Sequence, residues 1–255
     1  MLAEERRSKI IDFAETNGSC TVQELSQKFA VTLMTINRDL RKLGKEGKLK
    51  VVRGGAIAKS TEVTETSLSQ RINFNLEAKL SIADKAIKLI EPNDSIFLDS
   101  SSTSIILARK LKELDIENVT IITNSTQILS DLIPYEKFNV LSTGGTLLRK
   151  FHCFVGPLAE LLVSQLRVNK FFFSVGAVSI NGELSDTDIQ EVSLKKKMIE
   201  VSNEKILMVE SYKFNKTGLY KIINIEEIDM IINDGMKSGE PFVEEIRSKG
   251  LKIII

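Results

Sequence analysis

Residues 32–45 read TLMTINRDLRKLGK, and this stretch decides how the N-terminal part of the chain folds. Thr32 can cap a helix, because its hydroxyl can accept a hydrogen bond from a backbone N–H of the first turn. Ile36, Leu40 and Leu43 recur at the spacing of one helical face and are expected to point into a core. The outer face is polar and basic and consists of Thr35, Asn37, Arg38, Arg41, Lys42 and Lys45.

Two further helices are predicted before this one. Apolar residues follow one helical stripe between residues 4 and 16, and Asn17-Gly18 is a suitable end for that helix. Thr21 and Glu24 have the spacing of a capping box, which predicts a second helix that ends near Phe29. Two helices, a turn and a third helix with a basic outer face are typical of a helix-turn-helix, which enters the major groove of DNA. A helical bundle that contacts other proteins is the alternative.

A small hairpin is predicted after the third helix. Apolar residues at 49–52 and 56–57 enclose Arg53-Gly54-Gly55. The two glycines permit a tight turn and a close approach of the backbone to a DNA phosphate.

The charge of the chain is unevenly divided. Its 255 residues carry 35 Lys and Arg against 34 Asp and Glu, a net charge of +1. Residues 1–59 hold 12 basic and 7 acidic residues (+5), and the remainder holds 23 and 27 (−4). The content of 42% hydrophobic and 27% charged residues is that of a globular protein, and the length suggests two domains. A basic first domain suits a polyanionic partner such as DNA.

Localisation follows from what the sequence lacks. Cys20 and Cys153 lie far apart, so we expect no disulfide. No charged-then-apolar leader precedes a small-residue cleavage site, so we expect a cytoplasmic protein. Apolar runs stay shorter than the roughly 18 residues of a membrane span, so no membrane partner is expected.

The second part of the chain alternates short apolar runs with helical patterns. Residues 59–68 are rich in Ser, Thr and Glu, so we assign a linker to 59–76 between domains at 1–58 and 77–255. Alternating strands and helices predict a largely parallel α/β sheet. The expected strands are residues 95–98, 119–123, 138–141, 171–175, 206–209, 230–232 and 251–255.

The ends of these strands are the first place to look for a ligand, because ligands of parallel sheets bind beyond the carboxyl ends. The first strand runs into Asp99 and a hydroxyl-rich segment at 100–104 that enters a helix. Hydroxyls, backbone N–H groups and the positive end of the helix dipole would form a phosphate cradle there; a simple helix cap is the alternative.

Four segments of the first domain resemble the winged helix-turn-helix signature of the DeoR family of bacterial transcriptional regulators. They are Val22-Gln-Glu-Leu, Thr35-Ile-Asn-Arg-Asp-Leu, Gly47-Lys-Leu and Arg53-Gly-Gly-Ala. The family usually has Arg at position 37 and His at position 53; Asn favours adenine where Arg favours guanine. The residues that the resemblance and the helix pattern assign to DNA are Thr35, Asn37, Arg38, Arg41, Lys42, Arg53, Gly54 and Gly55.

The second domain resembles the C-terminal sensor domain of the same family. Asp99-Ser-Ser-Ser-Thr is similar to its Asp-x-Gly-Thr-Thr loop, Glu191-Val-Ser-Leu-Lys195 to its Glu-Ala-x-x-Lys helix, and Lys213-Phe to a Lys-Phe near its site. Ser101, Glu210 and Tyr212 depart from the usual Gly, Asp and Ser. The effector residues assigned are Asp99, Ser100, Ser101, Ser102, Thr103, Ser104, Asn124, Gly144, Gly145, Gly176, Asp188, Glu191, Lys195 and Lys213.

This resemblance implies a fold similar to ribose-5-phosphate isomerase and glucosamine-6-phosphate deaminase. It further implies a transcriptional regulator that binds operator DNA and whose effector is a phosphorylated sugar or sugar alcohol. For such a ligand, Lys195 and Lys213 are candidate cations, and Asp99, Asn124, Asp186, Asp188 and Glu191 are candidate acceptors for sugar hydroxyls. We expect a repressor of a carbohydrate-utilisation operon, and a dimer or tetramer because a repeated operator mirrors the symmetry of the protein.

An enzyme that acts on sugar phosphates is the main alternative. Related isomerases carry an Asp-Gly-Ala-Asp-Glu segment after the central strand, where this chain reads SVGAVS at 174–179, without a carboxylate. The sequence therefore favours a regulator, although Asp186, Asp188 and Glu191 leave catalysis open. His152 and Cys153 are adjacent, and successive side chains of a strand point to opposite faces, so we expect no metal and no cofactor. A protein-interaction adaptor is the third alternative.

Overall fold

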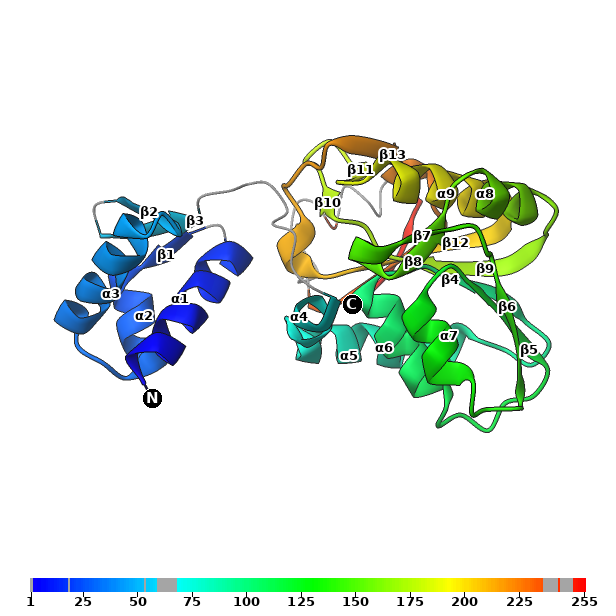
Figure 1. Ribbon diagram of the computed structural model, residues 1–255, viewed down its shortest axis with the longest axis horizontal. Helices are drawn as coiled ribbons and strands as arrows, with labels where there is room; N and C mark the ends of the chain where they lie inside the picture. Colours follow the sequence, from blue (N-terminus) through cyan, green and yellow to red (C-terminus); the bar gives the residue numbers. More distant parts are fainter. Residues whose placement is uncertain (1, 18, 53, 59–67, 236–242, 244–249) are drawn as a thin grey trace. The chain divides into compact units, whose positions relative to one another are not determined.

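The computed structural model describes residues 2–17, 19–52, 54–58, 68–235, 243 and 250–255. The chain divides into two compact units, residues 1–64 and 65–255, and each is described by itself (Figure 1). Arg53 and the predicted domain boundary after residue 58 lie outside the described residues.

The first unit is a winged helix-turn-helix, as the sequence predicts. Its core is formed by apolar residues of all three helices, including Ile10, Leu25, Ile36, Leu40 and Leu43. The expected capping box of Thr21 is present, and the Thr32 hydroxyl accepts a hydrogen bond from the backbone N–H of Thr35. Strands β1, β3 and β2 form an antiparallel sheet in that order. The elements are α1 (Ala3–Asn17), β1 (Ser19–Thr21), α2 (Val22–Phe29), α3 (Leu33–Lys45), β2 (Leu49–Val52) and β3 (Gly55–Ala58).

The second unit is built on a seven-stranded sheet with the order β15-β14-β12-β9-β4-β5-β6, and all its neighbouring strands are parallel. These strands confirm the α/β prediction. They are β4 (Ser95–Leu98), β5 (Val119–Thr123), β6 (Phe138–Ser142), β9 (Val168–Phe173), β12 (Ser202–Val209), β14 (Met230–Asn233) and β15 (Lys252–Ile254). Two small antiparallel sheets complete it: β7 (Thr146–Leu148) with β8 (Cys153–Val155), and β10 (Ala177–Val178) with β11 (Glu183–Asp186) and β13 (Tyr220–Asn224).

Helices cover both faces of the large sheet (Figure 1). One face carries α5 (Leu76–Ala86), α6 (Ser102–Leu111) and α7 (Thr126–Leu132), and the other carries α8 (Pro157–Ser164) and α9 (Ile189–Glu200). Short 3-10 turns occur at Ile87–Leu89, Arg149–Phe151, Ser211–Lys213 and Ile225–Glu227.

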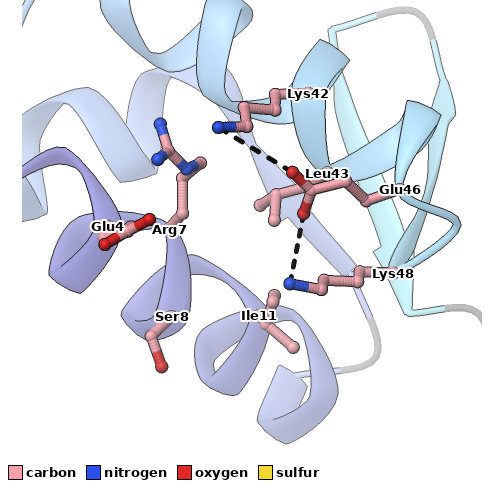
Figure 2. Close-up of a pocket in the computed structure, with 8 residues that line it drawn as sticks. All are labelled: Glu4, Arg7, Ser8, Ile11, Lys42, Leu43, Glu46 and Lys48. Atoms are coloured by element: carbon pink, nitrogen blue, oxygen red, sulfur yellow. Dashed lines mark ion pairs between the residues drawn. The ribbon is translucent and has the colours of Figure 1, made fainter.

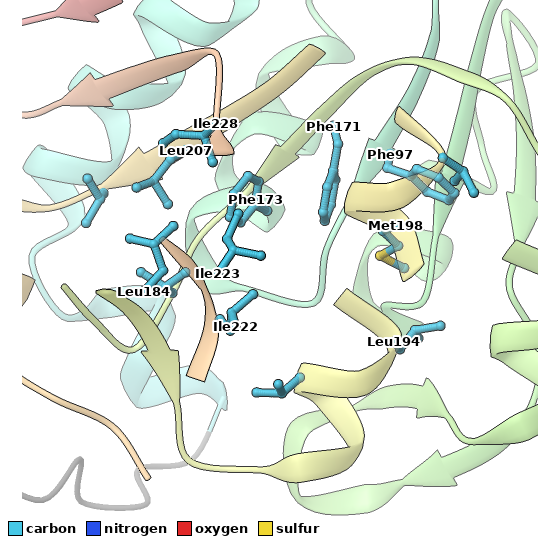
Figure 3. Packing of buried hydrophobic residues seen from close by; sticks show 14 of the residues in the cluster. Phe97, Phe171, Phe173, Leu184, Leu194, Met198, Leu207, Ile222, Ile223 and Ile228 are labelled. Carbon is cyan, nitrogen blue, oxygen red and sulfur yellow. The ribbon is translucent and has the colours of Figure 1, made fainter. Parts of the chain in front are cut away.

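The run Phe171-Phe172-Phe173 shows how each strand serves two cores. Successive side chains of a strand point to opposite faces, so Phe171 and Phe173 enter the core with α9, whereas Phe172 enters the core with α6. Figure 3 shows the first of these cores, in which the Phe171 and Phe173 rings stack at 4.8 Å. Burial on both faces explains why the strands read as continuous apolar runs.

The predicted linker of residues 59–76 is wrong at its C-terminal end. Residues Leu68–Asn73 form helix α4, which packs against α6, and Leu68 is buried in the core. The residues before Leu68 lack a helical pattern, but Leu68, Ile72 and Leu76 recur at four-residue spacing, which is one face of a helix.

The order of the strands fixes where a ligand is expected. Strand β4 comes first in the sequence and lies between β5 and β9, so the chain winds outward on both sides of the β4/β9 pair. Such a switch point opens a crevice at the carboxyl ends of the two strands. Asp99 follows β4 and Ser174 follows β9 at this point. In the part of the chain that is described, no helix is long and apolar enough to cross a membrane.

Candidate functional site

The outer face of α3 is exposed as predicted. Asn37, Arg38 and Arg41 are exposed, and Thr35 is half-buried, with its hydroxyl 3.0 Å from that of Thr32. The Asn37 amide donates to the carbonyl of Leu33 at 2.9 Å, so its carbonyl oxygen points away from that bond. These side chains project from a helix that its neighbours hold in place, which is the arrangement required to read base edges.

A buried ion pair, which was not predicted from the sequence, fixes α3 against α1. Asp39 is 3% exposed, and its carboxylate lies 2.7 Å from Arg6 Nε and 3.4 Å from Arg7 Nη1. Asp39 shares the inward stripe with Ile36 and Leu43 at spacings of three and four residues. An acidic residue on an apolar stripe was the signal that could have revealed it.

Lys42 lies at the edge of a hollow between α1 and the end of α3 (Figure 2). Its ammonium is 3.9 Å from Glu46, which also pairs with Lys48 at 3.1 Å. Lys42 is therefore partly matched by a carboxylate of its own helix, and its DNA contact stays a prediction. The hollow is lined by Glu4, Arg7, Ser8, Ile11, Lys42, Leu43, Glu46 and Lys48.

The wing glycines have different surroundings. Gly54 has a φ of +89°, no described atom outside its chain neighbours lies within 4 Å of where a Cβ would be, and its carbonyl accepts from the backbone N–H of Val22 at 2.9 Å. Gly55 is buried, and a Cβ there would collide with the Cys20 carbonyl. Gly55 thus has a packing reason to be glycine apart from any DNA contact, and Arg53 is outside the described residues.

Asp99 is the centre of the polar cluster in the second unit. Its Oδ1 accepts hydrogen bonds from the Ser101 and Ser104 hydroxyls, each at 2.6 Å, and from the Ser101 backbone N–H at 3.2 Å. Its Oδ2 accepts from the Ser174 N–H at 3.1 Å, which joins the ends of β4 and β9. The Ser101 hydroxyl also caps α6 by accepting from the Ser104 N–H. Two hydroxyls expected to meet phosphate are therefore already bound to a carboxylate.

Lys195 is buried beside this centre. Its ammonium donates to the Ser174 carbonyl at 2.7 Å and lies 3.3 Å from both Asp99 Oδ2 and Asp186 Oδ2. Burial opposes the charged form, but the nearby carboxylates of Asp99, Asp186 and Glu191 outweigh it and raise the pKa of Lys195. Lys195 therefore stays charged and joins α9 to the ends of β4, β9 and β11.

Glu191 adds a buried carboxyl whose pKa is raised. It accepts from the Ser100 hydroxyl at 2.6 Å and lies 3.6 Å from the Cys153 sulfur. Burial, with the Asp186 charge second, raises the pKa of Glu191, and burial likewise raises the pKa of the Cys153 thiol. This carboxyl is therefore easier to protonate than an exposed glutamate, and it can serve as donor or acceptor toward a sugar hydroxyl.

A second buried group contains Lys213. Glu210 is fully buried between Lys79 Nζ at 3.0 Å and Lys213 Nζ at 3.3 Å, and it accepts from the Thr103 hydroxyl at 3.2 Å. Burial would raise the pKa of Glu210, but the two lysines lower it overall. Lys213 also donates to the Ser174 hydroxyl at 2.9 Å, which connects this group to the Asp99 cluster. From the sequence, Glu210 was noted only as a departure from the family, and Lys79 was not predicted to belong to a site.

The remaining predicted residues lie in loops that follow strands or at the starts of helices. Asn124 follows β5 and donates to the Phe154 carbonyl at 3.2 Å. Asp188 accepts from the backbone N–H groups of Gln190 and Glu191 and so caps α9. Three glycines and one serine complete the set: Gly144 and Gly145 between β6 and β7, Gly176 against Asp186, and buried Ser102 at the start of α6.

Gly145 has a structural requirement. Its φ is +107°, and a Cβ would lie 2.7 Å from the Val155 carbonyl oxygen and 3.0 Å from the Ala159 Cβ. The turn after β6 therefore packs directly on the start of α8.

Comparison with known proteins agrees with both units. Residues 6–62 match the DeoR-like helix-turn-helix domain, and residues 74–235 match the DeoR C-terminal sensor domain. A winged helix-turn-helix joined to a sensor domain defines a DNA-binding transcriptional regulator. The chain belongs to the DeoR family of transcriptional regulators.

Several full-length relatives are similar over nearly the whole chain. An uncharacterized helix-turn-helix regulator of Bacillus subtilis, YulB, is 38% identical over 92% of this chain and 90% of its own. An L-fucose operon activator of Haemophilus influenzae is 33% identical over 90% and 91%. A putative aga operon repressor of Escherichia coli O157:H7 is 32% identical over 98% and 93%. Among solved structures, ribose 5-phosphate isomerase A of Methanocaldococcus jannaschii is 19% identical over 55% of each chain, with a TM-score of 0.41.

Proposed function

We propose that this regulator represses a carbohydrate-utilisation operon and that a phosphorylated sugar or sugar alcohol controls its binding to the operator. The observation that carries the proposal is the cluster of carboxylates, lysines and hydroxyls at the β4/β9 switch point, in a chain that also carries an exposed basic recognition helix. Relatives whose names refer to an L-fucose and an aga operon support a sugar operon. Because one of these relatives is an activator, repression itself needs a test.

The cluster offers a phosphosugar two kinds of contact. Asp186 and Glu191 provide carboxyl oxygens for sugar hydroxyls beside Lys195. The backbone N–H groups of Ser102 and Thr103 open α6, where the first N–H groups of a helix have no partner within the helix and the dipole favours an anion. The ligand would thus bind between the start of α6 and the start of α9.

On the DNA side, α3 would enter the major groove with Arg38 and Arg41 toward base edges or phosphates. Leu33 and Met34 are also exposed, at 48% and 74%, at the start of this helix, and apolar side chains there can contact thymine methyl groups. Helix-turn-helix proteins read repeated half-sites as symmetric oligomers, so we propose a dimer or tetramer. The effector would shift the population between head arrangements that can and cannot dock.

One experiment separates this function from its alternatives. The full chain is incubated with a panel of pentose, hexose and sugar-alcohol phosphates, and both its melting temperature and the chemical fate of each compound are measured. A rise in melting temperature without turnover supports a sensor, because a ligand that binds only the folded state stabilises it. Turnover would support a sugar-phosphate isomerase or deaminase, and no response to any compound would favour an adaptor.

A further inference from the structure

Two residues hold all the buried side-chain polar atoms that lack a hydrogen-bond partner within the described part of the chain. They are Arg71, through Nε and Nη2, and Asn124, through Oδ1. A buried donor or acceptor without a partner costs free energy, and the cost is larger for a charged group. Such unpartnered groups are rare in folded proteins, and a ligand is one explanation for their presence.

Both residues border the same segment. Arg71 lies on α4 with its guanidinium carbon 5.4 Å from the centre of the Phe151 ring, and Asn124 donates to the carbonyl of Phe154. The Arg71 charge is close enough to Glu191 and Tyr212 to act against the burial that raises the pKa of each. Arg71 is thus at the polar cluster, and it approaches from a helix that the sequence analysis had placed in the linker.

The charges of the cluster distinguish Arg71 from its lysines. Lys195 lies between two carboxylates and donates to a carbonyl, and Lys213 lies against Glu210 and the Ser174 hydroxyl. These ammonium groups are already matched within the protein. The Arg71 guanidinium forms no ion pair or hydrogen bond at Nε and Nη2 within the described residues, although Glu191 is near enough to feel its charge, so these two nitrogens remain for an external anion.

We propose that Arg71 binds the phosphate of the effector and that Asn124 accepts a hydrogen bond from one of its hydroxyls. A guanidinium presents its N–H donors in a planar fork that matches two phosphate oxygens. Helix α4 is the first helix after residues 59–67, which lead to the DNA-binding unit. A phosphate bound to Arg71 therefore restrains α4. Effector binding in the second unit would in this way act on the segment that connects the two units. The proposal rests on the proposed function, because it requires a phosphorylated effector.

The test compares the full-length chain with Arg71→Met, Arg71→Lys and, as a matched loss of one exposed charge, Arg167→Met. Each protein is titrated calorimetrically with the panel compound that stabilises the wild type and with its unphosphorylated sugar. We expect Arg71→Met to weaken binding of the phosphosugar at least tenfold, Arg71→Lys to retain part of the affinity, and Arg167→Met to bind normally. Without ligand, Arg71→Met should melt no lower than the wild type, because it removes a half-buried charge that forms no ion pair with any carboxylate of the described residues.

Hydrogen exchange of residues 68–73 provides the second measurement. The phosphosugar should slow exchange of these amides in the wild type and not in Arg71→Met. Equal affinity of Arg71→Met and the wild type would overturn the assignment of Arg71 and leave the proposed function standing. A large loss of melting temperature in unliganded Arg71→Met would show a structural role and would also overturn it. If no panel compound bound the wild type, the proposed function and this inference would both fail.

Discussion

Asp39 gives the sharpest prediction for the DNA-binding unit. Its carboxylate is 4% exposed and faces Arg6 and Arg7, whose side chains are 11% and 16% exposed. Removal of one partner from a fully buried pair costs about 3–5 kcal/mol, because the other charge is left without compensation. Since both arginines keep some contact with water, we expect about 2–3 kcal/mol for Asp39→Asn, or an opening equilibrium about 30- to 150-fold larger.

Hydrogen exchange of the full-length chain measures this opening directly. Amides of α1 and α3 should exchange about 30- to 150-fold faster in Asp39→Asn, whereas amides of β4 and β9 should be unaffected. The matched control is Glu46→Gln, which removes a carboxylate from an exposed pair on the same helix and should leave exchange unchanged. The double variant Arg6→Met with Asp39→Leu should restore part of the protection, because it removes both charges of the 2.7 Å pair together and leaves only Arg7, which keeps some contact with water. Unchanged exchange in Asp39→Asn would refute the anchoring role.

Three other predictions concern Glu191 and the Gly144-Gly145 turn of the second unit and the exposed arginines of α3. Glu191→Gln should raise the melting temperature of the second unit, and the gain over the wild type should grow as the pH rises above 4.5. The pKa of Glu191 is raised in the folded state, so the wild type loses stability as the pH rises through that pKa, whereas the glutamine stays neutral. A melting-temperature difference that is largest below pH 4.5 would contradict this. Gly145→Ala should destabilise that unit more than Gly144→Ala in urea unfolding, since both have positive φ but only Gly145 has a carbonyl where the Cβ would lie. Arg38→Ala and Arg41→Ala should each weaken operator binding in anisotropy titrations by about 1–3 kcal/mol for a base contact, or reduce the salt slope by about one for a phosphate contact; unchanged titrations in both variants would remove α3 from the interface.

Local periodicity made much of the fold predictable. The stripe of Ile36, Leu40 and Leu43 gave the recognition helix, because burial of one face every 3.6 residues is a local property of the sequence. The apolar runs gave all seven strands of the parallel sheet, because burial on both faces removes polar positions from a strand. Helix α4 was not predicted, because the polar residues 59–67 precede it directly and no turn signal marks its start.

Contacts between distant residues were not predictable from spacing. Asp39 pairs with a residue 33 positions away, and Lys79 pairs with Glu210 across 131 positions. The composition of the 100–104 loop indicated a phosphate site, but the structure shows that the Ser101 and Ser104 hydroxyls donate to Asp99. The polar groups that remain free for a ligand are those that form no hydrogen bond or ion pair within the cluster. These bonds join residues from several segments, so no single segment of sequence predicts them.

The central claim is that occupancy of the sensor unit by a phosphosugar changes the affinity of the DNA-binding unit for its operator. The most direct measurement is the dissociation constant for a DNA fragment selected by the full-length protein from a random pool, with and without the phosphosugar that raises the melting temperature. We predict that the compound weakens DNA binding at least fivefold, a coupling of about 1 kcal/mol or more, and that its unphosphorylated sugar has no effect. Equal DNA affinity with and without a compound that demonstrably binds would contradict the claim.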